Sequence, residues 1–116
     1  MKYFDKWELD CKCGCGLYNI TPELEQLLDQ VRELAGVPLI ISSGSRCEKH
    51  NKAEGGSPNS SHLRGLAVDV KVRDSQSRYR VLKALEELNI ERIGIAKSFI
   101  HFDIDRAKPT KVVWVY

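Results

Sequence analysis

The residues with the clearest chemical potential are two histidines and one aspartate. His62 lies in a segment rich in serine and glycine, and Asp69 follows inside an apolar, strand-like run. Burying a carboxylate in such a run is costly unless a partner or a metal ion compensates its charge. His101 occupies a second apolar run further along the chain. Two imidazoles and one carboxylate match the ligands of a catalytic zinc ion, which takes three protein ligands and leaves a fourth position for water.

Each of these residues also has an ordinary explanation. A lone histidine near a strand is often a surface or hydrogen-bonded side chain, and Asp69 could pair with Lys71 or Arg73. Asp103 favours the metal interpretation, because a carboxylate two residues after His101 can orient a metal-binding imidazole. The residues alone leave both interpretations open, so the decision depends on the elements that position them.

Two segments have the apolar periodicity of amphipathic helices. The first starts at Thr21 and Pro22, which suit the cap and the first helical position, and it ends at Gly36. The second follows Asp74 and covers about residues 76–88. The predicted buried faces are Leu24, Leu27, Leu28, Val31 and Leu34 in the first helix, and Tyr79, Leu82, Leu85 and Leu88 in the second.

Five short segments are predicted to be strands: residues 38–43, 66–72, 90–95, 98–104 and 111–116. Because strands and helices do not alternate strictly, we expect an α+β fold with a central, mostly antiparallel sheet and two main helices. The two-residue period of a strand places Asp69 opposite Val68 and Val70, and it places His101 and Asp103 together on one face.

Two irregular segments complete the chain. Residues 44–61 form a long connection with a short helix expected at 48–54, and this connection ends at His62. Long connections in small domains are usually functional or disordered, so we expect an active-site loop here. Residues 1–20 are expected to form a strap over the core. Its apolar anchors are predicted to be Phe4, Trp7, Leu9, Leu17 and Ile20.

The tip of the strap carries Cys11, Cys13 and Cys15, and a fourth cysteine, Cys47, lies in the long loop. Three interpretations stay open for them: reduced thiols packed around a turn, ligands of a second metal ion, or a disulfide to Cys47. The spacing within the turn is tighter than the pairs of most structural zinc sites.

Size and charge exclude several classes of protein. The 116 residues suit one domain, 1–116, and the net charge of +2 does not indicate nucleic-acid binding. No apolar stretch is long enough for membrane insertion, and we expect a monomer. Residues 1–8 lack the apolar region of an export signal, so we expect synthesis in the cytoplasm without a signal peptide.

Several blocks of the sequence resemble the M15 family of zinc peptidases. Residues 60–69 fit the pattern Ser-x-His-x-x-Gly-x-Ala-x-Asp, residues 42–46 are similar to a Ser-Gly-x-Arg segment, and residues 99–103 are similar to the closing His-x-Asp strand. The family includes D-alanyl-D-alanine carboxypeptidases and phage cell-wall endopeptidases, and it shares its fold with the hedgehog signalling domain. The compact length and the Cys-x-Cys-Gly-Cys start resemble its small phage and prophage branch.

The resemblance implies one catalytic zinc ion bound by His62, Asp69 and His101. It also implies that Arg46 faces the substrate carbonyl, with a structural salt bridge as the alternative role. Ser43 and Ser61 are the residues expected to line the substrate groove.

The sequence lacks a general base at the two positions where members of the M15 family carry one. Several family members carry a glutamate three residues before the last zinc histidine, where this chain has Ser98, and others carry a histidine at the position of Ala96. Asp103 is therefore nominated as base or as orienting carboxylate. The fallbacks are Glu48, Glu54 and His50.

These expectations converge on a zinc metallopeptidase that cuts bonds involving D-amino acids in peptidoglycan stem peptides. Such an enzyme would serve phage or prophage lysis and would act on the cell wall after release by another factor. The alternatives are a non-catalytic zinc-binding module of the same fold and, on the cysteine cluster, a redox or metal-transfer protein.

Overall fold

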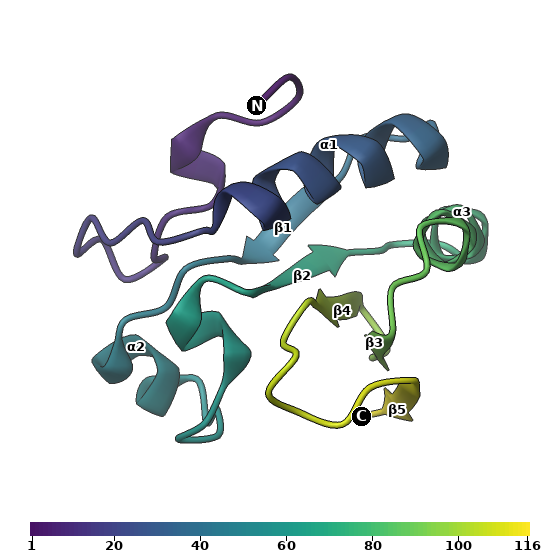
Figure 1. Ribbon diagram of the computed structural model, residues 1–116. Coiled ribbons are helices and arrows are strands. Elements are labelled where there is room, and N and C mark those ends of the chain that lie inside the picture. Colours follow the sequence, from purple (N-terminus) through teal and green to yellow (C-terminus); the bar gives the residue numbers. More distant parts are fainter.

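A five-stranded sheet lies at the centre of the computed structural model, which describes residues 1–116 (Figure 1). Its strand order is β1-β2-β4-β3-β5. Neighbouring strands are antiparallel except for β5, which is parallel to β3. The strands are β1 (Ile40–Ser43), β2 (Ala67–Lys71), β3 (Arg92–Ile95), β4 (Phe99–Asp103) and β5 (Val112–Val115). The predicted α+β class with a mostly antiparallel sheet is confirmed.

The helices start and end where the local signals predict. Helix α1 (Pro22–Ala35) is capped by Thr21, whose hydroxyl accepts a hydrogen bond from the backbone N–H of Leu24. It ends at Gly36, whose φ of 69° is left-handed and suits glycine. Helix α3 (Ser75–Glu87) is capped by the Asp74 carboxylate. The short helix α2 (Glu48–Ala53) and the 3₁₀ helices η1 (Lys6–Glu8) and η2 (Ser61–Arg64) lie in the connections.

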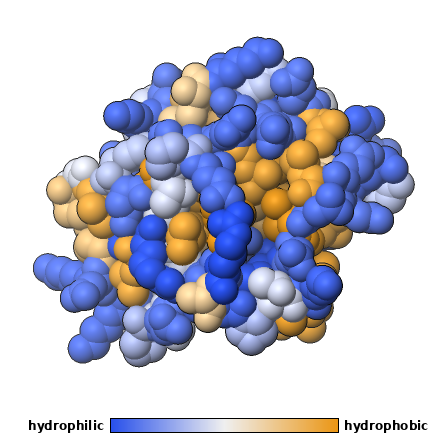
Figure 2. All heavy atoms as spheres, in the orientation of Figure 1, coloured by the Kyte–Doolittle hydropathy of each residue, from blue (hydrophilic) through white to orange (hydrophobic).

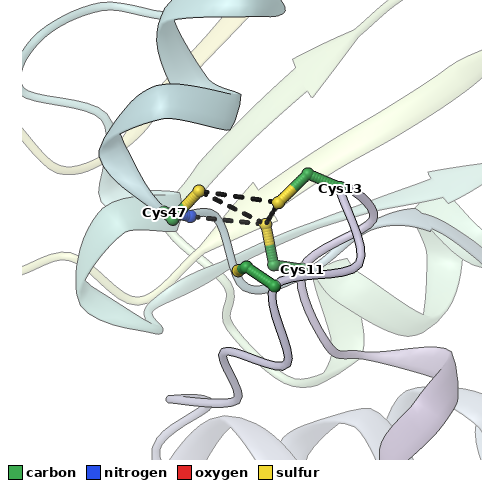
Figure 3. Close-up of side chains that lie close together, drawn as sticks. Cys11, Cys13 and Cys47 are labelled. Atoms are coloured by element: carbon green, nitrogen blue, oxygen red, sulfur yellow. Dashed lines mark hydrogen bonds between the residues drawn. The ribbon is translucent and has the colours of Figure 1, made fainter.

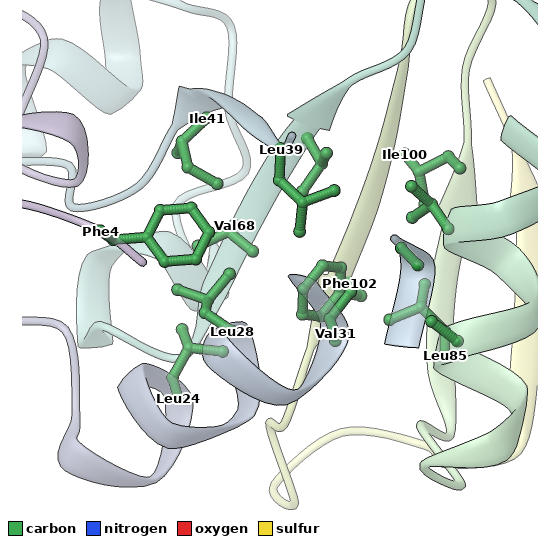
Figure 4. Close-up of a cluster of buried hydrophobic side chains, with 14 of the residues drawn as sticks. Phe4, Leu24, Leu28, Val31, Leu39, Ile41, Val68, Leu85, Ile100 and Phe102 are labelled. Atoms are coloured by element: carbon green, nitrogen blue, oxygen red, sulfur yellow. The ribbon is translucent and has the colours of Figure 1, made fainter. Parts of the chain in front are cut away.

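One face of the sheet packs against α1 and α3 and forms a core of 18 buried residues (Figure 4). The strands contribute every second side chain to this face, as the two-residue period requires. Phe4, Leu9 and Ile20 add the N-terminal strap to the same core. The central side chains are Leu24, Leu28 and Val31 of α1, Val81 and Leu85 of α3, Val68 and Val70 of β2, and Ile100 and Phe102 of β4.

Three of the predicted core positions are wrong. Leu34 is 49% exposed, because the buried stripe of α1 runs through Leu28, Val31 and Ala35, and Leu34 lies to one side of it. Tyr79 is 65% exposed, since α3 buries the face that carries Val81, Ala84 and Leu85. Trp7 is 70% exposed in η1, where the flanking residues supply the buried anchors instead.

The opposite face of the sheet carries a row of polar and aromatic residues. Asp69 of β2 pairs in register with His101 of β4, His101 with Gly94 of β3, and Gly94 with Trp114 of β5. A Cβ atom at Gly94 would lie 2.6 Å from the Trp114 ring, so only glycine lets that ring cross β3. As a result, the Trp114 ring centroid lies 5.4 Å from that of His101.

The surface is largely polar. Figure 2 shows hydrophilic residues over most of the face seen in Figure 1, with hydrophobic residues gathered in its middle. None of the helices combines the length and the apolar character needed to cross a membrane.

The core can be tested with two leucines of the same helix. Leu28→Ala removes a fully buried side chain, so the free energy of unfolding should fall by about 2–5 kcal/mol. Leu34→Ala removes the same atoms from an exposed site and should change it by less than about 0.5 kcal/mol. Urea denaturation of both variants gives the comparison, and equal losses would contradict the observed burial.

Candidate metal centre

The fold brings His62, Asp69 and His101 together on the polar face of the sheet. They come from η2, β2 and β4, and all three side chains are buried. One donor atom from each lies within 4.8 Å of the others. Residues from three separate elements therefore present two nitrogens and an oxygen to one point.

The orientation of both imidazoles is determined by their second ring nitrogen. His62 Nδ1 lies 2.9 Å from the carbonyl oxygen of Gly44, which can only accept, so this nitrogen carries the proton. His101 Nε2 lies 2.7 Å from Asp103 Oδ2. The free nitrogens, His62 Nε2 and His101 Nδ1, lie 3.3 and 2.8 Å from Asp69 Oδ1. This donor set, with each ring held by a second partner, fits a tetrahedral divalent metal of the kind that zinc exemplifies.

Local backbone features place His62. The Ser60 hydroxyl accepts a hydrogen bond from the His62 N–H and starts η2, which ends at Gly65 with a left-handed φ of 70°. A Cβ atom at Gly65 would lie 1.9 Å from the carbonyl oxygen of Asn19, so the turn packs tightly against the N-terminal strap. The Asn19 side chain also donates to the carbonyl oxygen of Leu63. The strap and η2 therefore hold each other in place.

Asp103 has both of its oxygens engaged. Oδ1 accepts hydrogen bonds from Arg92 Nε at 2.7 Å and from the N–H of Asp105 at 3.1 Å, while Oδ2 faces His101. Its side chain is only 1% exposed. Burial favours the neutral acid, but the hydrogen bond with His101 and the other partners outweigh it and lower the Asp103 pKa. This geometry suits a carboxylate that holds His101 in position.

Arg46 is locked beside the metal ligands. Its Nη2 lies 3.3 Å from Asp69 Oδ2, its Nε donates to Ser43 Oγ at 2.9 Å, and its Nη1 donates to Asn51 Oδ1 at 3.1 Å. The guanidinium thus connects β1, α2 and β2. Arg46 makes a structural ion pair with Asp69, which was the alternative role expected from the sequence, and it also lines the cleft described below.

The charges in the site stabilise one another. Burial opposes ionisation of Asp69, but its interactions with the His101 and His62 rings prevail and hold its pKa well below the usual range. Burial also opposes protonation of His101, yet its hydrogen bonds with Asp103 and Asp69 raise its pKa. Without a metal, the protonated His101 ring therefore bridges two carboxylates, donating from Nδ1 to Asp69 Oδ1 and from Nε2 to Asp103 Oδ2.

A cleft of about 510 Å³ opens over these residues. Glu54 lies on its wall, and so do Trp114 of β5 and Tyr116, the residue that follows β5. Burial raises the pKa of the Tyr116 phenol, which therefore stays a hydrogen-bond donor. The cleft is lined by Arg46, Glu54, Gly55, Gly56, Ser57, Ser60, Ser61, His62, Asp69, Arg92, Phe99, His101, Asp103, Lys108, Trp114 and Tyr116.

The two serines expected in the groove lie close to the site but are occupied by other contacts. Ser61 lines the cleft, and its hydroxyl donates to Asp105 Oδ2 at 2.6 Å. Ser43 lines a smaller neighbouring cavity and holds Arg46. Of the fallback bases, Glu54 lines both cavities and His50 only the smaller one, while Glu48 lines neither.

Several residues of the site escaped the sequence analysis. Arg92, which holds Asp103, carries no local signal, because its role depends on the pairing of β3 with β4. Trp114 and Tyr116 share one face of the last strand by the two-residue period, and that alternation was the available signal. Asn51 holds Arg46 from within α2.

A sheet face that presents two imidazoles and a carboxylate to a cleft is the arrangement of a metal-dependent hydrolase. The family model of Peptidase M15 matches residues 2–103, and the chain therefore belongs to this family of metallopeptidases. The resemblance seen in the sequence is confirmed. No curated protein matches the chain.

Competition between protons and metal gives a testable pH dependence. The His101 pKa is raised in the metal-free fold, so its contribution to stability is present below the ordinary value of 6.5 and is lost as pH rises through the raised value. Deprotonation leaves His101 Nδ1 and Asp69 Oδ1 as two acceptors facing each other. A divalent cation placed between them removes this repulsion.

We expect the gap in melting temperature between metal-loaded and chelated protein to widen from about pH 6 to about pH 9. Thermal unfolding followed by circular dichroism across this range measures the gap. A His101→Asn variant is the control and should show a smaller gap with a weaker pH dependence. A wild-type gap that stays constant with pH would contradict the proton–metal exchange.

Proposed function

We propose that the protein is a zinc metallopeptidase that hydrolyses peptide bonds involving D-amino acids in bacterial peptidoglycan. The observation that carries this proposal is the convergence of His62 Nε2 and His101 Nδ1 on Asp69 Oδ1 at the wall of an open cleft. When bound, zinc polarises the scissile carbonyl and makes water a nucleophile near neutral pH. The remaining chemistry falls to the side chains of the cleft.

Arg46 and Tyr116 are the candidates for stabilising negative charge on the carbonyl oxygen. Arg46 places a fixed cation 3.3 Å from Asp69 Oδ2, and its three partners hold it there before substrate arrives. Preorganised donors of this kind need no rearrangement when charge develops in the transition state. Tyr116 adds a neutral O–H donor on the wall of the same cleft.

Glu54 is the proposed proton carrier. The carboxylates that line the cleft are Glu54, Asp69 and Asp103. Asp69 is assigned to the metal and Asp103 is held by Arg92 and His101, whereas the Glu54 side chain is 56% exposed and has only His50 beside it, at 3.5 Å. A carboxylate with this freedom can move toward the attacking water and then protonate the leaving amine. Asp103 is a positioning residue in this scheme.

A bound divalent metal would favour an anionic substrate. The three basic residues that line the cleft, Arg46, Arg92 and Lys108, are balanced by its three carboxylates, so the metal would make the cleft net positive, and stem peptides of peptidoglycan carry free carboxylates. We propose that the substrate is such a peptide and that the protein works as a monomer on the cell wall, after release by another factor during phage or prophage lysis. Carboxypeptidase and endopeptidase action both agree with a cleft that is open to solvent.

A non-catalytic zinc-binding wall module is the second candidate. It is favoured by the engagement of both Asp103 oxygens, because this leaves no buried carboxylate free to accept a proton from water. The two candidates differ in whether wall fragments are released.

The first test is digestion of purified peptidoglycan, with new amino termini or free D-alanine detected by mass spectrometry. Wild-type protein should release products, chelation should abolish release, and added zinc should restore it. His62→Ala should reduce turnover by at least about 100-fold, because one of three metal ligands is lost. Tight wall binding without any products would establish the non-catalytic module instead.

The second test addresses the proton carrier with two glutamates near the ends of one short helix. Glu54→Gln should lower kcat by about 10²–10⁴-fold with the zinc content unchanged. Glu48→Gln, on α2 but outside the cleft, should leave kcat unchanged. Normal turnover in Glu54→Gln would remove Glu54 from the mechanism.

A further inference from the structure

A second group of side chains that could hold a metal ion lies outside the cleft. Cys11, Cys13 and Cys15 come from the turn at the tip of the N-terminal strap, and Cys47 immediately precedes α2. Figure 3 shows Cys11, Cys13 and Cys47 pointing toward one another from these two segments. All four sulfurs lie within 4.8 Å of one another.

We propose that Cys11, Cys13, Cys15 and Cys47 bind a structural zinc ion that clamps the strap to the active-site loop. The sulfur–sulfur distances are 3.4 Å for Cys11–Cys13, 3.8 Å for Cys11–Cys47 and 3.7 Å for Cys13–Cys47. Four thiolates at about 2.3 Å from a tetrahedral zinc ion stand about 3.8 Å apart. The cluster therefore already has nearly the dimensions of the occupied site.

The backbone of the turn is built to gather these thiols. Gly14 and Gly16 have left-handed φ values of 86° and 84°, a conformation that other residues rarely adopt. The N–H of Gly14 donates to the carbonyl oxygen of Cys11, and the N–H of Cys11 donates to that of Leu17, which closes the turn. Alternate residues Cys11, Cys13 and Cys15 are thereby brought to one place in spite of their close spacing.

Backbone N–H groups support negative charge on the sulfurs. The N–H of Cys47 lies 3.4 Å from Cys11 Sγ, and the N–H of His50 lies 3.3 Å from Cys47 Sγ. Hydrogen bonds to the charged form favour the thiolate, which is the form that binds metal. Binding one zinc ion to four thiols releases their protons to solvent.

Other uses of the four thiols fit less well. A disulfide joins its sulfurs at about 2.0 Å, consumes the thiols in pairs and needs an oxidant. An iron–sulfur cluster attaches its thiolates to different irons and so needs sulfurs spread further apart than those around one ion. Four converging thiolates around a single point are the ligand set of structural zinc.

The position of the cluster gives it a role in the active site. Cys47 follows Arg46, and Ser45 between β1 and Arg46 donates its N–H to the carbonyl oxygen of Leu9 at 2.8 Å. A Cβ atom at Gly44 would lie 2.6 Å from that same oxygen, so the strap and loop are in close contact here. The carbonyl oxygen of Gly44 in turn fixes the His62 ring. A metal at the cysteines would therefore hold the segment that orients His62 and Arg46.

The test counts metal in purified protein by mass spectrometry and identifies its ligands by X-ray absorption. His62→Ala protein should keep about one zinc ion per chain, with four sulfur ligands at about 2.3 Å. The double variant Cys13→Ser/Cys15→Ser should lose this ion. Lys12→Ala, in the same turn, removes no sulfur and should keep it.

The outcome does not depend on the peptidase proposal, because the sulfur-bound ion is measured in protein that lacks a ligand of the other site. One zinc ion that stays bound after the His62→Ala substitution would support the cysteine site even if the cleft proved catalytically inactive. Iron in place of zinc, a disulfide found by mass spectrometry, or four reactive thiols in the folded, zinc-exposed protein would overturn the proposal.

A second measurement covers a cysteine variant that fails to fold. Cobalt added to metal-free His62→Ala protein should give the charge-transfer absorption of thiolate–cobalt bonds and the visible bands of a tetrahedral site. Absence of thiolate–cobalt absorption would count against the site without requiring any cysteine substitution.

Discussion

One carboxylate oxygen holds the site together. Asp69 Oδ1 faces nitrogens of both His62 and His101, and the other oxygen of Asp69 meets Arg46. A buried anion in this position is tolerated only because cationic or metal partners surround it. The Gly44 carbonyl and the Asp103 carboxylate each hold an imidazole ring that faces this charge. Arg46 compensates the charge directly, and Arg92 holds Asp103.

One face of the sheet stabilises the fold, and the other face carries the side chains that could do chemistry. Along β2 and β4, valine, isoleucine and phenylalanine alternate with Asp69, His101 and Asp103, so the apolar face that anchors α1 and α3 also makes the polar face rigid. The site thus stands on strands, which hold geometry better than loops. His62 and Arg46 are exceptions, and the strap and the Arg46 contacts compensate for their loop positions.

The two groups of metal-binding residues are linked by a short path through the backbone. Residues 44–47 touch the strap through Leu9, contribute Cys47 to the sulfur cluster, and orient His62 through the Gly44 carbonyl. The same segment carries Arg46, the proposed electrophilic residue. A small domain with a modest core gains order from such a clamp, as small metal-binding proteins commonly do. Because Ser98 and Ala96 stand where several family members carry a general base, that role is proposed for Glu54, which lines the cleft.

The sequence by itself determined the helices, the strands and the ligand candidates, because these depend on local signals. Thr21, Gly36 and Asp74 mark helix ends through their own backbone and side-chain chemistry, and His62, Asp69 and His101 stand out as polar residues next to apolar strand segments. Local periodicity was a weaker guide at the edges of helix faces, and it misplaced Leu34 and Tyr79.

The tertiary structure alone decided which partners each side chain meets. The pairing of β5 beside β3 brings Trp114 over His101, and the pairing of β3 with β4 gives Asp103 to Arg92. The meeting of Cys47 with the N-terminal turn depends in the same way on contacts between distant segments. A local pattern can place a residue on a face, but strand order and loop path determine what lies opposite, and those follow from packing of the whole chain.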